Sequence, residues 1–346
     1  MKTKQYNGLK LIKGLSMIAL LIFSFTCNYP NNFSYIAPSV KFHSIGTNFG
    51  IYTVSILFVL FGFFISQQLE EKVKPLQFAA QKFASYYPIY LIGVVLTFLA
   101  TKFYLVERAL PLKTMILNVL MLNNFVNYDG WGNVDEAYLI ITFFFVFLVF
   151  VTFVLLIGQR RNLLPITAIW GVIGFLLSVF GEAYGIIPMR IISIAFCGRY
   201  GLVFAAGIAI HNMTKKERTV FGGFITLVSV LFMQLGFDNW KYTAVYLIGL
   251  VMILFAIAGG REVEKFAESK WMQWLIGLSE ISFPVFLLMG YFGQAIMKFL
   301  CIRLPAFPGE IIMIAPIAIV IVLSSLIYTF LQKPLSNAVA KRFENK

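Results

Sequence analysis

Long apolar runs constrain this sequence more than any other feature. A helix that crosses the hydrocarbon core of a bilayer needs about 20 mostly apolar residues. Ten runs approach that length, and they cover residues 9–27, 51–66, 86–105, 137–158, 164–180, 187–210, 220–235, 243–258, 281–299 and 311–330. An eleventh apolar stretch, residues 115–125, is too short to span, so we expect it to lie at the interface or to re-enter. The sequence predicts an all-α polytopic membrane protein with about ten transmembrane helices.

The composition agrees with this prediction. Of 346 residues, 60% are hydrophobic and 12% are charged, and the mean hydropathy is +0.84. A soluble domain carries about 25% charged residues, so the balance excludes a water-soluble enzyme, a disordered chain and a fibrous repeat. The three cysteines, Cys27, Cys197 and Cys301, are too few and too scattered for a disulfide framework or a zinc site. We expect one membrane domain over residues 1–346, with no separate soluble domain, no metal and no bound cofactor.

The charged residues predict the orientation of the chain. Short cytoplasmic loops carry an excess of Lys and Arg. If the N-terminus is inside, the inner segments hold 19 of the 28 basic residues and seven acidic ones, which is nearly all of the net charge of +13. This predicts a multi-pass protein of the cell membrane with both termini in the cytoplasm. The bilayer is then the expected partner and nucleic acid is not, because the basic residues lie between apolar runs and form no single patch.

The clearest charged candidates inside or beside predicted spans are Arg190, Arg199 and Glu280, since charge is costly there and marks candidate functional sites. Arg190 and Arg199 are nine residues apart, so on one helix they would point to opposite sides. Either arginine could face an anionic substrate. Alternatively, Arg190 reaches the interface and Arg199 pairs with a carbonyl or an acid. Glu280 stands before the ninth run, either as a proton acceptor or cation partner, or as a first-turn carboxylate with Ser279 helping to cap.

The remaining candidates have simple structural alternatives. His43 and His211 are the two possible imidazole bases, although a lone histidine in a loop is usually solvated or structural. Asp135 and Glu136 precede the fourth run and fit a helix cap better than a catalytic pair. Two groups of lysines remain, either setting the topology or binding cytosolic phosphates: Lys10 and Lys13 in the first run, and Lys82 before the third.

Six short segments follow one another along the chain: Gly8–Ala19, Phe58–Ser66 (FVLFGFFIS), Lys82–Tyr90 (KFASYYPIY), Tyr138-Leu139, Ile281–Gly290 (ISFPVFLLMG) and Gln332-Lys333-Pro334. Their order resembles that of the acyltransferase family 3 membrane proteins. That family begins with a basic lead and a first span of the form R/K, ten residues, His. Phrases like FFxxSGFLIS, R-x-x-R before Tyr-Pro, W-Y/S-L, iSYPLYLLH and a closing E-R/K-P follow. The resemblance covers almost the whole chain.

The resemblance implies transfer of an acyl group, usually acetyl, from cytosolic acyl-CoA to a hydroxyl of an extracytoplasmic or lipid-linked glycan. Acyl-CoA would be a donor substrate and no cofactor would be bound. In the family a first-span histidine is the base or acyl relay, and that position is Ser24 here. The late histidine position is Met289. Basic residues near the inner face would hold the CoA phosphates, and the candidates here are Lys13, Lys82 and Arg199.

Several polar family positions carry other residues in this chain, namely Phe61, Ser85, Ala137 and Gln332 besides Ser24 and Met289. A serine cannot replace imidazole as a base near neutral pH. Three functions therefore stay open. The first is a divergent acyltransferase with relocated catalytic groups, whose weak catalytic candidates are Glu280 and His43. The second is an inactive acyltransferase-like protein that assists surface polysaccharide assembly or export. The third is a solute transporter that uses Arg190, Arg199 and Glu280.

Overall fold

The computed structural model describes residues 6–28, 47–70, 74–126, 133–135, 137–307 and 309–344. It is 85% helical, and the described residues form no strand. Within these described ranges, eight helices are long and apolar enough to cross a membrane, and the figure rises to ten if each of two bent helix pairs is one span. The chain is therefore a helical membrane protein, and each predicted run coincides with one of these helices or pairs. The short stretch 115–125 lies in two helices too short to span, α5 (Leu112–Val119) and α6 (Asn123–Val126).

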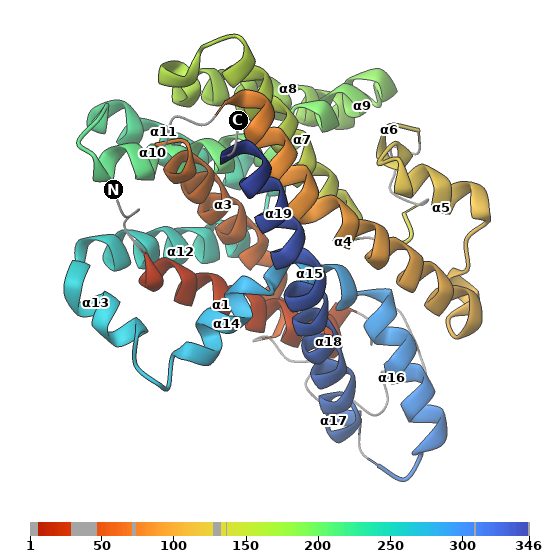
Figure 1. Cartoon of the computed structure of the whole chain (residues 1–346). Helices are drawn as coiled ribbons and strands as arrows, with labels where there is room; N and C mark the ends of the chain where they lie inside the picture. The colour runs from red at the N-terminus through yellow and green to blue at the C-terminus, as the bar shows by residue number, and fades with distance from the viewer. Residues whose placement is uncertain are drawn as a thin grey trace. The chain divides into compact units, whose positions relative to one another are not determined.

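The chain divides into two compact units, and Figure 1 draws both. Unit 1 comprises residues 1–19, 51–74 and 149–280, and unit 2 comprises residues 20–50, 75–148 and 281–346. Two helices, α1 (Asn7–Phe23) and α7 (Tyr138–Leu156), run from one unit into the other. The expectation of one membrane domain over residues 1–346 depends on how the two units join, and it stays a prediction.

Unit 1 is built around α3 and α10, which pack closely along their lengths. Its helices are α3 (Val54–Gln68), α8 (Leu163–Ala183), α9 (Ile187–Ala195), α10 (Gly201–Thr214), α11 (Thr219–Phe237), α12 (Trp240–Ala258), α13 (Gly260–Ala267) and α14 (Gln273–Glu280). The close approach of α3 and α10 depends on glycines. A Cβ on Gly62 would clash with the Phe204 carbonyl oxygen, and a Cβ on Gly207 with that of Val59. Small residues at such contacts let helix backbones pack tightly in a membrane.

Unit 2 contains α4 (Pro75–Phe103), a helix of 29 residues that packs against α7, α15 and α16. Its other helices are α5, α6, α15 (Ser282–Leu288), α16 (Tyr291–Arg303), α17 (Gly309–Ile312), α18 (Ile314–Ile327) and α19 (Lys333–Glu344). Aromatic contacts fill the space between α4, α7 and α15. The Tyr86 ring lies 4.8 Å from Phe144 and 4.9 Å from Phe283.

Both bent pairs break at identifiable places. The α15–α16 pair bends by 56° between Leu288 and Tyr291, and the α9–α10 pair bends by 44°. In the second pair Cys197 and Gly198 have φ angles of 55° and 46°, a left-handed conformation that cannot continue a right-handed helix. Arg190 and Arg199 therefore do not share one helix. The prediction that they point to opposite sides is wrong, because the chain turns between them.

Candidate functional site

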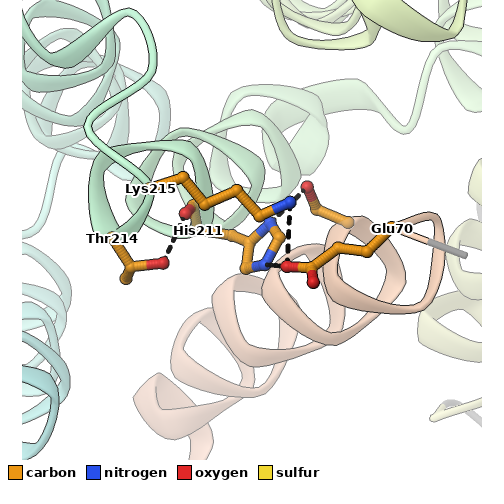
Figure 2. A network of polar contacts seen from close by, with 5 residues as sticks. Glu70, His211, Thr214 and Lys215 are labelled. Carbon is orange, nitrogen blue, oxygen red and sulfur yellow. Dashed lines mark hydrogen bonds and ion pairs between the residues drawn. The ribbon is translucent and has the colours of Figure 1, made fainter. Parts of the chain in front are cut away.

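The most connected polar cluster of unit 1 joins the ends of α3 and α10. His211, on the last turn of α10, is only 1% exposed. Its Nδ1 lies 2.8 Å from Ser66 Oγ on α3, and its Nε2 lies 2.8 Å from Glu70 Oε1 just beyond α3. Lys215 Nζ lies 2.9 Å from the same Glu70 oxygen. Figure 2 shows this oxygen bridging His211 and Lys215.

Helix periodicity explains why these four side chains meet. Ser66 and Glu70 are four residues apart at the end of α3, and His211 and Lys215 are four apart at the end of α10. Residues at this spacing lie on one helix face. Because α3 and α10 run parallel and in close contact, the two faces meet. Thr214 lies beside the cluster, and its Oγ1 donates only to the backbone carbonyl oxygen of His211, at 2.7 Å.

The cluster fixes the protonation pattern of the imidazole. An ionised carboxylate only accepts hydrogen bonds, so Nε2 of His211 donates to Glu70. In neutral imidazole Nδ1 is then the acceptor, and Ser66 donates its hydroxyl proton to it. Burial raises the pKa of Glu70, but the hydrogen bond and charge of Lys215, together with His211, outweigh burial and hold this pKa below 4.5. A serine hydroxyl, an imidazole and a carboxylate thus form a continuous line.

Ser24, which the resemblance predicts to stand in place of a histidine, lies in unit 2. It begins a π-helical turn, Ser24–Asn28, at the end of α1, and its side chain is buried. Its Oγ donates to the Met289 carbonyl oxygen at 2.9 Å, in the break between α15 and α16. Met289 is the second residue that the resemblance predicts to stand in place of a histidine. The structure brings Ser24 and Met289 into contact, and neither carries an imidazole.

Asp135 is a further buried acid at the same break, and it is 0% exposed. Its Oδ1 accepts from the Ala137 amide at 2.9 Å, which is the capping contact expected before the fourth run. Its Oδ2 accepts from the Tyr291 amide at 2.5 Å and so also caps the start of α16, a contact the sequence does not predict. Its neighbour Glu136 lies outside the described residues.

The two arginines of the predicted sixth span both meet the end of α8. Arg190 Nε donates to the Gly181 carbonyl oxygen at 3.0 Å, and its guanidinium also donates to the Glu182 carbonyl oxygen at 3.2 Å. Arg199 pairs with the Glu182 carboxylate, and its guanidinium lies 5.5 Å from the centroid of the Phe237 ring. Arg199 thus has the acidic partner that the sequence left open, and both arginines converge on Glu182.

Glu280 is the last residue of α14, so it does not occupy the first turn of a helix as one alternative expected. Its carboxylate lies 3.8 Å from Lys10 Nζ, and both side chains are partly exposed. Lys13 lies three residues after Lys10 on α1 and is half-buried. No contact in the described structure joins Lys13 to Arg199, which pairs with Glu182. Lys82 belongs to unit 2, where its Nζ lies 5.8 Å from the centroid of the Phe78 ring.

His43 lies outside the described residues. Among the residues that are described, no group of three or more His, Cys, Asp or Glu could hold a metal ion. The sequence predicts His211 as a possible imidazole base but does not indicate its partners Ser66 and Glu70. The signal was present in the two i,i+4 pairs at the ends of two runs, but only the packing of α3 on α10 joins them.

Comparison with known proteins adds no identification, because no family model, no curated protein and no solved structure matches this chain.

Proposed function

We propose that this protein is a membrane acyltransferase whose base is His211. It moves an acyl group, such as acetyl, from cytosolic acyl-CoA to a hydroxyl of a lipid-linked or extracytoplasmic glycan. The order of phrases along the chain supports the family plan, as does the contact between Ser24 and Met289, which joins the two family histidine positions. The observation that carries the catalytic part is the line of contacts from Ser66 through His211 to Glu70.

The hydrogen bond of Ser24 is the reason to assign the catalytic base to His211 and not to the region around Ser24. Its hydroxyl proton is held by a backbone carbonyl, so this serine has no base to activate it. Ser66 differs because its hydroxyl meets an imidazole nitrogen that accepts the proton. A nucleophile, a base in contact with it and a third group that orients the base form the usual arrangement for covalent acyl transfer.

The reaction balances with these groups alone. Ser66 Oγ attacks the thioester carbonyl while His211 Nδ1 takes its proton, the carbon–sulfur bond breaks, and the thiolate leaves with that proton as the CoA thiol. The acceptor hydroxyl then gives its proton to His211 and attacks the acyl-serine ester, and Ser66 recovers a proton as it leaves. Glu70 holds the imidazole tautomer throughout. Lys215, whose ammonium group pairs with Glu70, keeps that carboxylate ionised.

The test measures thiol release from acetyl-CoA by the full-length protein in detergent. General-base catalysis contributes about 10²–10⁴-fold, so His211→Gln and Ser66→Ala are expected to lower the rate by at least about 100-fold. Glu70→Gln should lower kcat and change KM to a smaller extent. Thr214→Val is the matched control, because it removes a neighbouring hydrogen bond outside the relay, and its rate should stay near that of the unmodified chain. Equal rates in all variants contradict the proposal.

The alternative is an inactive acyltransferase-like protein that assists surface polysaccharide assembly or export. The absence of imidazole at both Ser24 and Met289 favours it. Under this alternative no acyl-CoA is turned over, and Ser66→Ala supports polysaccharide export as well as the unmodified chain. This alternative is ruled out if Ser66→Ala abolishes polysaccharide export and the unmodified chain releases measurable thiol from acetyl-CoA.

A further inference from the structure

An apolar groove lies between α4 and α16 in unit 2. It is lined by α4 between Leu96 and Tyr104 and by α16 between Phe292 and Phe299, and its volume is about 300 Å³. Lining side chains are open to the surroundings, since Leu99 is 42% and Phe103 is 67% exposed. On a membrane-spanning helix an exposed apolar surface contacts lipid, so the groove is in place to receive an acyl chain.

One end of the groove is aromatic and basic. The Tyr104 ring lies 5.8 Å from the Phe299 ring, and the Arg303 guanidinium lies 5.5 Å from the centroid of the same Phe299 ring. Tyrosine and arginine at a helix end are typical of the level of lipid headgroups. One part of the groove is therefore wholly apolar, and its other end lies next to the Arg303 guanidinium.

The charges at this end leave a cation for an anionic ligand. Lys298 Nζ is paired with the Glu107 carboxylate at 3.0 and 3.1 Å. Arg303 is exposed and has no carboxylate partner among the residues that the structure describes. An anion is thus favoured next to Arg303.

We propose that this groove binds an anionic membrane phospholipid, with one acyl chain between α4 and α16 and the phosphate at Arg303. A helix of a second protein would need an apolar surface along the groove but no anion at its end. The combination of an apolar groove and an unpaired arginine fits a phospholipid better. This binding site is independent of the acyltransferase proposal, because it uses none of the same residues.

The experiment titrates the full-length protein in detergent with phosphatidylglycerol or phosphatidylcholine and counts bound lipids by native mass spectrometry. We expect phosphatidylglycerol to bind in preference. A basic residue near a membrane surface contributes about 1 kcal/mol to anionic-lipid binding, so Arg303→Gln should reduce this preference about fivefold. Arg342→Gln, an exposed arginine near the end of α19, is the matched control and should leave it unchanged.

A second variant tests the groove itself. Ala295 lines it and is 3% exposed, so Ala295→Phe should lower the binding of both lipids. Thermal unfolding establishes that each variant is folded. Equal binding of the two lipids by the unmodified chain overturns the proposal, as does an equal effect of Arg303→Gln and Arg342→Gln. A dimer that Ala295→Phe dissociates, without loss of lipid, identifies the occupant as a second copy and also overturns it.

Discussion

Gly207 shows how much of the candidate site depends on a single residue without a side chain. It lies where α10 meets α3, one turn before His211, and a Cβ there would clash with the Val59 carbonyl oxygen and also approach the Phe63 amide. The backbone contact at Gly207 therefore holds the two helices close enough for His211 to reach Ser66 and Glu70.

Gly207→Ala is expected to destabilise the protein by about 1–3 kcal/mol, the usual cost of overpacking. Gly223→Ala is the control, because it makes the same change inside α11 where the new Cβ meets nothing within 4 Å. This control should be neutral or stabilising, since alanine favours a helix over glycine. Thermal unfolding in detergent compares the two, and equal unfolding temperatures contradict the packing described for α3 and α10.

Glu70 gives the network a defined pH dependence. A carboxyl group whose pKa is lowered by folding stabilises the native state above its unfolded pKa, and this contribution is lost as pH falls through the folded pKa. The window therefore lies below the ordinary value of 4.5. Unfolding temperature should fall on acidification in this range, and by less in Glu70→Gln than in the unmodified chain. The same acid dependence in both proteins contradicts an ionic role for Glu70.

The sequence predicts the contacts of buried polar residues only in part. It predicts the contact of Asp135 with the start of its own helix, because helix capping is local. The partners of His211 and the second contact of Asp135 join residues more than 140 positions apart in the chain, and no local pattern determines them.

Single helices were predictable where an apolar run is long enough to span a membrane. Each run corresponds to a helix or a helix pair because hydrophobicity and length decide this outcome. The two breaks were not predictable in the same way. Residues 281–299 read as one run, yet the helix stops at Leu288 and restarts at Tyr291, where Asp135 from another segment supplies the cap.

Asp135 should therefore stabilise the break between α15 and α16. Asp135→Asn replaces an acceptor oxygen near the Tyr291 amide with a weaker or mismatched group, at a cost of about 1–3 kcal/mol. Hydrogen exchange at the Tyr291 amide is expected to accelerate, and exchange in α11 of unit 1 serves as the internal control. Unchanged exchange at Tyr291 would show that the break does not depend on this carboxylate.

At the scale of the whole molecule, helix directions within each unit bear on the topology. In unit 1, α3 and α10 run parallel, with Phe58 next to Tyr200 and Ser66 next to His211. In unit 2, α4 runs antiparallel to α7, since Tyr86 meets Phe144 while Thr97 meets Tyr138. These directions agree with a count of ten spans, in which α3 and α10 are the second and sixth and α4 and α7 the third and fourth.

The ten-span proposal, with both termini in the cytoplasm, makes a direct prediction. Green fluorescent protein fused after Lys346 should fluoresce in cells, and alkaline phosphatase fused at the same place should be inactive. Fusions between α8 and α9, at Gly185, should give the opposite pair of results. Phosphatase activity after Lys346 contradicts the topology, which depends on the excess of basic residues in alternate segments.

Covalent labelling of Ser66 tests the central proposal most directly. The full-length protein is incubated with isotopically labelled acetyl-CoA, quenched in acid and digested, and the peptide that carries Ser66 is examined by mass spectrometry. The acyl-transfer account predicts labelled acetyl on Ser66, release of an equal amount of CoA thiol, and loss of both in His211→Gln but not in Thr214→Val. An unlabelled Ser66 in folded protein, with no thiol released, contradicts it.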